Sequence, residues 1–170
     1  MIPLYAYDFD KTLIPYDSFR RYLLHLLPLR PIRIGGLLVM RKMGFISSSR
    51  MKAYITKIVN TSPSLQRDAK HFAHSIVYDV QIPAIASKDA KVLLISASPS
   101  VYMKYIAEDL SYDLLCSDMN GEHYNELYGE AKALALHTYY PTSEYEYVYA
   151  ESDNEIDLCW MRDFNEYRII

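Results

Sequence analysis

Cysteine is scarce in this sequence, which excludes the small proteins that depend on disulfides or on cysteine-bound metals. The two cysteines, Cys116 and Cys159, have no metal-ligand spacing, and two alone make no disulfide framework. The first ten residues contain no Lys or Arg, and the apolar run among them is too short for a secretory signal. We therefore expect a cytoplasmic protein whose cysteines are reduced thiols.

Long apolar runs are also absent, which excludes a membrane-spanning helix. An apolar stretch lies at residues 34–40, but a span would need about twenty uninterrupted apolar residues. Arg30 and Arg33, together with Pro28 and Pro31, interrupt this region. The segment could lie on a bilayer surface, but we expect that it does not cross one. The composition, 51% hydrophobic, is ample for the packed core of one domain.

Acidic residues are nearly missing from the early part of the chain. Residues 11–60 contain ten Lys and Arg but one acid, Asp17, which gives this region a formal charge of +9. The remainder has a charge of −12, because the whole chain has a net charge of −3. This asymmetry indicates that the early region faces something anionic and that the remainder binds cations; a solvated helical face is the alternative.

The first chemically informative segment is residues 5–13, an apolar run that ends in two carboxylates. Successive side chains of a strand point to opposite faces, so Asp8 and Asp10 would share one face at the carboxyl end of a strand. Open α/β sheets bind ligands at that edge. Two acids this close repel each other unless a cation or a shared proton lies between them, so we expect a divalent metal. A solvated strand end or a helix cap is the alternative, whereas a calcium loop is excluded because Leu13 and Phe19 occupy its Gly and Glu positions.

The region from residue 14 to about 88 is predicted to be helical. Apolar residues recur at helical spacing over 17–27, where Asp17 or Ser18 would cap the helix. Further helical patterns lie at about 50–59 and after Ser62. The last of these contains His71 and His74 on one face, and we interpret them as packing or surface histidines because no third metal ligand is near.

An apolar, β-branched run at 91–99 predicts a buried parallel strand, and a helix is expected to follow at about 100–110. Ser98 and Pro99 have the form of a helix cap followed by a first-turn proline. Ser96 would then lie at the end of the strand beside the amino terminus of the helix, where free N–H groups favour a phosphate. A plain Ser-Pro cap is the alternative interpretation.

The last part of the chain predicts further strands and one more helix. A short strand at 112–116 precedes a polar connection at 118–128, and a helix begins near Gly129. Lys132 lies in its first turns, where the helix dipole does not favour a cation, so we expect an anionic partner for it. A strand at 145–150 is followed by Asp153 and Asp157, which would share a helical face if a helix has begun. Residues 167–170 are predicted to be an edge strand.

Four motifs in this order resemble the haloacid dehalogenase-like phosphatase superfamily. They are Asp8-Phe9-Asp10-Lys11-Thr12, Ser96, Lys132 and Ser152-Asp153-Asn154-Glu155-Ile156-Asp157. The long helical insertion and the segment 96–99 resemble the phosphoserine phosphatase-like subclass. The resemblance implies an α/β fold with a Rossmann-like parallel-sheet core, formed by residues 1–13 and 89–170, and an inserted helical cap, formed by residues 14–88.

The resemblance also implies a role for each motif in the hydrolysis of a phosphomonoester. Asp8 corresponds to the nucleophile that takes up the phosphoryl group. Asp10 corresponds to the general acid and base that protonates the leaving alcohol and then activates water. Ser96 and Lys132 correspond to the groups that bind the oxygens of the transferring phosphoryl group. Such a division of tasks suits phosphoryl transfer, because its transition state spreads negative charge over several oxygens.

The cofactor implied by the resemblance is Mg²⁺. Asp8, the backbone carbonyl of Asp10 and Asp153 correspond to its ligands, and Asp157 corresponds to the acid that supports them. The last motif departs from the family, which usually has Gly-Asp-Ser where this chain has residues 152–154. Glu151, just before, adds negative charge near the metal.

The substrate is left open between several classes. Asp17 matches an acidic position of the subclass and could contact a polar group of the leaving alcohol, and Arg20 and Arg21 are further candidate substrate contacts. Parts of the insertion, including residues 17–27, look similar to bacterial phosphatidylglycerophosphate phosphatases. A lipid phosphate, with peripheral contact to an anionic inner membrane surface, is therefore one alternative.

Two other interpretations remain at this stage. The basic region would equally suit a small soluble phosphoester such as phosphoserine or a sugar phosphate. A non-catalytic module that keeps the fold and binds anions or a membrane surface is the rival from another class of protein. Dehalogenation is less favoured because it has no use for the second acid, Asp10. We expect no nucleic-acid partner.

Overall fold

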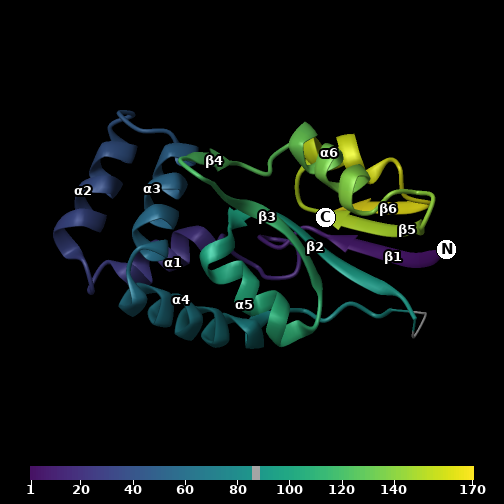
Figure 1. Ribbon diagram of the computed structural model, residues 1–170, viewed down its shortest axis with the longest axis horizontal. Coiled ribbons are helices and arrows are strands. Elements are labelled where there is room, and N and C mark those ends of the chain that lie inside the picture. Colours follow the sequence, from purple (N-terminus) through teal and green to yellow (C-terminus); the bar gives the residue numbers. More distant parts are fainter. Residues whose placement is uncertain (86–88) are drawn as a thin grey trace.

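The computed structural model describes residues 1–85 and 89–170, and these form one sheet with helices on both faces (Figure 1). The strand order is β4-β3-β2-β1-β5-β6, and every neighbouring pair is parallel except β3 and β4. The predicted α/β class with a Rossmann-like parallel sheet is therefore confirmed. The strands are β1 (Ile2–Tyr7), β2 (Lys91–Pro99), β3 (Asp113–Asn120), β4 (His123–Asn125), β5 (Tyr145–Ser152) and β6 (Glu166–Ile169).

The helices fall into an inserted group and a group that connects the strands. The inserted helices are α1 (Ser18–Leu26), α2 (Pro31–Lys42), α3 (Ser48–Asn60) and α4 (Pro63–Ile76), followed by the 3₁₀ turn η1 (Val77–Asp79). The connecting helices are α5 (Ser100–Leu110), α6 (Glu130–Tyr139) and α7 (Leu158–Met161), with the 3₁₀ turn η2 (Glu155–Asp157) before α7. Within the described residues, no helix has the length and apolarity needed to cross a bilayer.

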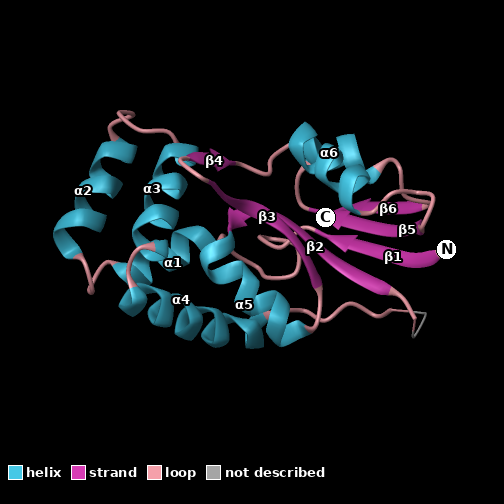
Figure 2. Ribbon diagram, in the orientation of Figure 1, coloured by secondary structure: helices cyan, strands magenta, loops and turns pink. Residues whose placement is uncertain are grey.

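Successive side chains of β1 point to opposite faces of the sheet and therefore belong to two separate hydrophobic cores. Leu4 and Ala6 pack with Leu136 of α6 and Trp160 of α7. Tyr7 belongs to the core on the other face, which includes α5 and the inserted helices. Figure 2 shows α6 on one side of the strands and α4 and α5 on the other. The central strands are thus covered on both faces, as their continuous apolar sequence requires.

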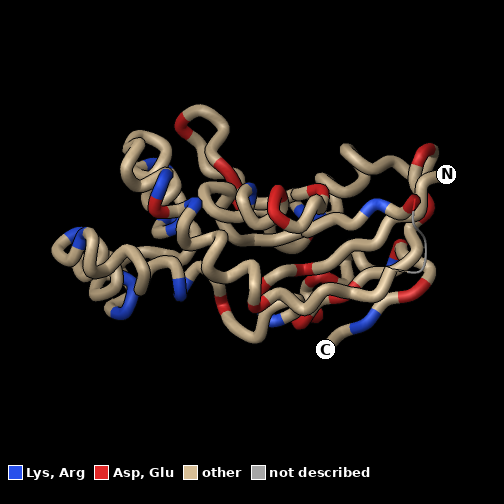
Figure 3. The backbone as a smooth tube through the Cα atoms, turned by 90° about the horizontal axis from the view of Figure 1, so that it is seen from below, with Lys and Arg blue, Asp and Glu red and all other residues tan. Residues whose placement is uncertain are grey.

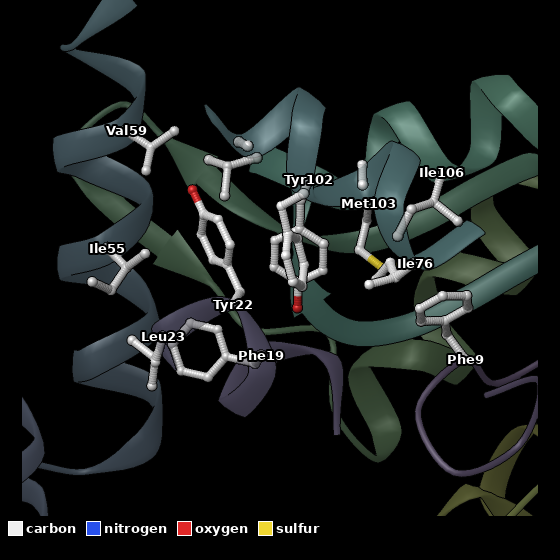
Figure 4. Packing of buried hydrophobic residues seen from close by; sticks show 14 of the residues in the cluster. Phe9, Phe19, Tyr22, Leu23, Ile55, Val59, Ile76, Tyr102, Met103 and Ile106 are labelled. Atoms are coloured by element: carbon white, nitrogen blue, oxygen red, sulfur yellow. The ribbon is translucent and has the colours of Figure 1, made fainter. Parts of the chain in front are cut away.

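The inserted helices share one hydrophobic core with the sheet. Tyr22 of α1 lies with its ring centroid 4.9 Å from Phe72 of α4 and 5.0 Å from Tyr102 of α5. Ile55 of α3 is buried in the same cluster, together with Phe9 from the loop after β1 (Figure 4). Aromatic rings at these distances attract each other in addition to the area that they bury. This packing fixes the insertion against the carboxyl edge of the sheet.

Several local predictions are confirmed by the structure. Asp17 caps α1, because its carboxylate accepts a 2.8 Å hydrogen bond from the N–H of Arg20. The predicted strand at 91–99 and helix at 100–110 match β2 and α5. The predicted edge strand matches β6 at the end of the sheet. His71 is exposed, and His74 pairs with Asp109 of α5, so both are surface histidines as interpreted from the sequence.

Two local predictions were wrong. Pro99, not Ser98, is the residue that precedes α5, and no side chain caps this helix. The hydroxyl of Ser98 instead donates a hydrogen bond to the carboxylate of Asp10. In the low dielectric of a buried site, this hydrogen bond to a charged group is stronger than one to the backbone at the end of a helix. The supposed connection at 118–128 contains the end of β3 and the strand β4, joined at Gly121.

The division of the chain into a core of residues 1–13 and 89–170 and a cap of residues 14–88 stays a prediction. Its second boundary falls at residues 86–88, which lie outside the described residues.

Candidate active site

A small cavity lies at the carboxyl ends of β1, β2 and β5. Asp8 follows β1 directly, Ser96 belongs to the end of β2, and Asp153 follows β5. Parallel strands bring these ends to one edge of the sheet, which is where α/β folds bind ligands. The cavity has a volume of about 180 Å³ and is lined by Asp8, Asp10, Lys11, Asp17, Lys52, Ser96, Ala97, Tyr128, Lys132, Asp153, Asn154 and Asp157. The structure thus brings together every predicted catalytic, phosphate-binding and metal-site residue.

Lys132 is the central cation of this cavity. Its Nζ donates hydrogen bonds of 2.7 Å to Oδ1 of Asp8 and 2.7 Å to Oδ2 of Asp157, and only 3% of its side chain is exposed. The ring of Trp160 lies 5.9 Å from the same nitrogen. Burial by itself would lower the pKa of Lys132, but the attraction of Asp8 and Asp157 outweighs it and raises the pKa. Lys132 therefore keeps its positive charge, and Asp8 and Asp157 are the anionic partners that its position in the first turns of the helix predicted.

Asp8 has too little positive charge near it to stay fully ionised. Burial raises the pKa of Asp8 to about 7, and Lys132 opposes this shift without cancelling it. Asp157 and Asp10 add to the increase through repulsion. One lysine shared by two buried carboxylates leaves an excess of negative charge, so a further cation would be favoured here.

Asp10 is oriented by the start of α1 and by the end of β2. Its Oδ1 accepts a 2.6 Å hydrogen bond from the N–H of Ser18, and its Oδ2 accepts one of 2.5 Å from the hydroxyl of Ser98. The Ser18 hydroxyl in turn lies 2.9 Å from the hydroxyl of Tyr102. Burial raises the pKa of Asp10, although both serines stabilise its ionised form. A carboxyl that keeps its proton more readily than usual is suited to act as an acid.

The residues after β5 are held by one hydrogen bond to the first motif and one to the end of β5 itself. The N–H of Asp153 donates a 3.0 Å hydrogen bond to the hydroxyl of Thr12, and the hydroxyl of Ser152 donates one of 2.7 Å to Asp157. Asp157 belongs to η2, which begins only at Glu155, so Asp153 and Asp157 do not share a helical face as their spacing suggested. Asp157 instead faces Lys132, and Asp153 lines the cavity on its own.

The donor atoms of the cavity fit a hard divalent cation. Five carboxylates and three lysines line it, which leaves an excess of two negative charges. Among the described residues, the carboxylate of Asp153 has no hydrogen bond and no ion pair, so its oxygens are free for a metal. No group of three or more His, Cys, Asp or Glu side chains in the described chain is arranged to hold a metal. A cation would therefore depend on Asp8, Asp153 and oxygens that are not side chains, such as the carbonyl of Asp10.

The remaining predicted residues divide into those at the cavity and those outside it. Ser96 is buried, and its hydroxyl accepts a 3.1 Å hydrogen bond from the N–H of Ser98. Asp17 lines the cavity from the start of α1. Arg20 and Arg21 are not among the lining residues. Arg21 forms a 3.0 Å ion pair with Asp79, and its guanidinium lies over the ring of Tyr16.

Two lysines at the cavity were missed in the sequence. Lys52 of α3 donates hydrogen bonds of 2.8 Å to the carbonyl of Ala97 and 3.1 Å to Glu126, so it reaches the cavity from the insertion. Lys11 has a φ of 57°, in the left-handed region where a residue other than glycine is uncommon. Nothing in the sequence distinguishes Lys52 from the other cations of the insertion. Lys11 stood inside the first motif but received no role.

The site is a lysine held between two buried acids, Asp8 and Asp157, at the carboxyl edge of a parallel sheet, with Asp10 and Asp153 beside it. The family model for haloacid dehalogenase-like hydrolases matches residues 6–162, so the chain belongs to the haloacid dehalogenase-like hydrolase family. The resemblance seen in the motifs is confirmed at this level.

Comparisons with known proteins agree with this assignment. Protein CicA of Caulobacter vibrioides is 25% identical over 193 aligned positions, which cover 98% of this chain and 86% of that protein. The structure of a protein of unknown function from Bordetella pertussis Tohama I has a TM-score of 0.78 at 15% identity and covers 98% of this chain and 89% of its own. A substrate-bound phosphoserine phosphatase has a TM-score of 0.55 at 11% identity and covers 98% and 85%. The fold is thus that of phosphoserine phosphatase-like proteins.

Proposed function

We propose that this protein is a magnesium-dependent phosphomonoester hydrolase that works through an aspartyl-phosphate intermediate. The observation that supports this most directly is the ion pair between Lys132 and Asp8 in a buried cavity that also contains Asp10 and Asp153. Proteins of this family generally use Mg²⁺. Asp8 and Asp153 would hold it with the carbonyl of Asp10, and the bound cation would neutralise charge on the phosphoryl oxygens.

In the first half-reaction, a carboxylate oxygen of Asp8 attacks the phosphorus, and the bond between phosphorus and the ester oxygen breaks. Asp10 donates its proton to that oxygen, which leaves as an alcohol. In the second half-reaction, Asp10 takes a proton from water, the water oxygen attacks the phosphorus, and the bond to Asp8 breaks. Phosphate leaves and both carboxyl groups return to their starting forms.

Lys132 and Ser96 would bind the oxygens of the transferring group. Lys132 is already held at Asp8, so it stands beside the attacking atom before substrate enters. Ser96 lines the cavity from β2, four residues before α5 begins, and its hydroxyl could donate a hydrogen bond to a phosphoryl oxygen. Ser98 and Ser18 position Asp10 and do not need to touch the substrate.

The size of the cavity bears on the substrate. A volume of about 180 Å³ is below the range of about 300–1000 Å³ that is usual for drug-sized ligands. Lys52 and Asp17 line it from the insertion. A phosphoryl group on a short alcohol would fill it, which supports a small soluble phosphoester. A lipid phosphate such as phosphatidylglycerophosphate is the second candidate, with its acyl chains outside the cavity; the exposed face of α2 described below favours it.

The test is hydrolysis of a panel that contains p-nitrophenyl phosphate, phosphoserine, a hexose phosphate and phosphatidylglycerophosphate, with Mg²⁺ and with a chelator. We expect hydrolysis that requires Mg²⁺ and that falls by several orders of magnitude in Asp8→Asn. Asp163→Asn, which changes an exposed acid that does not line the cavity, serves as the control. Hydroxylamine should cleave the aspartyl-phosphate of the wild type, releasing phosphate and leaving an adduct on Asp8. It should leave no adduct on Asp8→Asn, which cannot form the intermediate. Near wild-type turnover in Asp8→Asn would disprove the mechanism.

A further inference from the structure

The second inserted helix has an apolar face that points away from the protein. Of the twelve residues of α2, only Ile34 is buried. Ile32 and Val39 of α2, and Met43 directly after it, lie on the opposite side and are 89%, 56% and 63% exposed. Together with Gly36 they are spaced by four, three and four residues, which places them on a single stripe of a helix. A side chain built at Gly36 would meet no atom within 4 Å, so this stripe faces open space.

Cations border this stripe on both sides. On a helix of 3.6 residues per turn, Arg33 and Lys42 fall about a quarter turn to either side of it. Neither has an acidic partner within 4.0 Å in the part of the chain that the structure describes. The sequence has no Asp or Glu between Ser18 and Arg67, so no acid of α1, α2 or α3 offsets them. By contrast, the cations Lys52 and Lys57 of α3 are paired with Glu126 and Glu122.

The stripe lies at one end of the molecule. Figure 1 shows α2 farthest from the strands, with α3 between it and the rest, and Figure 3 shows several Lys and Arg positions at this end. The segments that enter and leave α2 add two more exposed apolar side chains, Leu29 and Phe45. A row of apolar side chains on a projecting helix, with cations at its borders, can reach a flat surface without hindrance from the rest of the chain.

We propose that this α2 outer face, defined as Ile32, Gly36, Val39 and Met43 with Arg33 and Lys42 at its borders, is a docking surface for an anionic lipid bilayer. The apolar stripe would enter the boundary between headgroups and acyl chains, and the cations would contact lipid phosphates. A second copy of the chain fits less well, because a symmetric contact would set the unpaired cations against each other. The surface lies outside the cavity, so the proposal does not depend on the phosphatase chemistry.

The test is flotation of the full chain with vesicles of phosphatidylglycerol mixed with phosphatidylcholine, and with vesicles of phosphatidylcholine alone. We expect binding to the anionic vesicles at low salt, weaker binding at higher salt, and little binding to the neutral vesicles. Val39→Asp should weaken anionic vesicle binding about tenfold or more, because it places a charge in the apolar stripe. Arg33→Gln should weaken it about fivefold, the loss typical of one cation near an anionic surface.

Matched controls come from the opposite end of the molecule. Leu134→Asp changes an exposed leucine of α6, and Arg162→Gln removes an exposed cation; both should bind vesicles as the wild type does. All variants should hydrolyse p-nitrophenyl phosphate equally, so a loss of docking is separate from a loss of chemistry. No hydrolysis by any form would reject the proposed function without affecting the vesicle result.

Three results would overturn the docking proposal. They are the absence of anionic vesicle binding at low salt, equal binding to neutral vesicles, and wild-type binding by both Val39→Asp and Arg33→Gln. A concentration-dependent dimer that Val39→Asp dissociates, without vesicle binding, would instead identify a second copy as the occupant.

Discussion

Lys132 and Asp8 lie 124 positions apart in the chain and form a 2.7 Å ion pair that is almost completely shielded from water. Asp157 shares the same lysine, also at 2.7 Å. A buried cation between two acids stabilises the fold only while all three groups are present, because each charge loses its hydration on burial. The pair therefore links the stability of the protein to its proposed chemistry.

Lys132→Met should destabilise the fold by about 3–5 kcal/mol at pH 7, because Asp8 and Asp157 are left buried without a cation. Urea denaturation measures the change, and Lys70→Met on the exposed side of α4 serves as the control. The folded pKa of Lys132 is raised above 10.5, so its contribution is present below that pH and is lost only as the pH rises through the raised value. The defect should shrink as the pH falls below about 7, because protonated Asp8 no longer needs a cation. A loss below about 1 kcal/mol at pH 7 would contradict the role of this ion pair.

Mg²⁺ should bind less tightly as the pH falls below about 7. The pKa of Asp8 is raised to about 7 in the folded chain, and the cation must displace the proton that Asp8 then holds. We expect the apparent affinity to fall about tenfold per pH unit below that value and to level off above it. Calorimetric titration in two buffers of different ionisation enthalpy should show proton release at pH 6 and little at pH 8. Asp153→Ala should weaken binding at both pH values; an affinity unchanged between pH 6 and 8 would exclude Asp8 as a ligand.

The same shift predicts how the metal-free protein responds to pH. Asp8 is protonated in the folded chain between its unfolded pKa of 3.8 and about 7, so the folded state binds the extra proton in that window. The stability contributed by this proton is present below the window and is lost as the pH rises through 7. Chemical denaturation in chelator should show the decline, and Asp8→Asn should remove it.

Ser98→Ala should impair catalysis without removing a group that touches substrate. The serine hydroxyl stabilises the ionised form of Asp10 at 2.5 Å, so its loss should raise the pKa of Asp10 further. We expect kcat to fall about tenfold, the scale for a weakened acid-base step, and the limb of the pH–rate profile due to Asp10 to move to higher pH. Ser64→Ala on the exposed surface of α4 should change neither. A uniform loss of activity with no shift of the profile would indicate a structural role only.

Lys11→Gly should stabilise the protein relative to Lys11→Ala by about 1 kcal/mol, because residue 11 has a φ of 57° and only glycine adopts this conformation without strain. Thermal denaturation of the two variants measures the difference. If Lys11 also attracts the phosphoryl group at the cavity, both variants should show an increased KM for p-nitrophenyl phosphate. Equal stability of the two variants would show that the loop relaxes around residue 11.

Much of the fold could be predicted from local patterns. The amphipathic spacing after Asp17 determines α1 and its cap, and the continuous apolar run before Ser96 determines a strand that is covered on both faces. The order of the motifs also places Asp8, Ser96 and Asp153 at one edge, because parallel strands end on the same side of a sheet. These features depend on residues close together in the chain and on the order of the segments, which is why they can be predicted from the sequence.

The partners of individual side chains were decided by tertiary structure alone. Ser98 stands where the sequence predicts a helix cap, but its hydroxyl donates a hydrogen bond to Asp10. Asp157 has the spacing of a helical neighbour of Asp153, but it accepts a hydrogen bond from Lys132. Lys52 reaches the cavity only because α3 packs against the end of β2, whereas Arg21, just as basic in sequence, pairs with Asp79. The sequence does not specify where a charged side chain points. Its electrostatic energy depends on how deeply it is buried and on which opposite charge the packing of distant segments brings close to it.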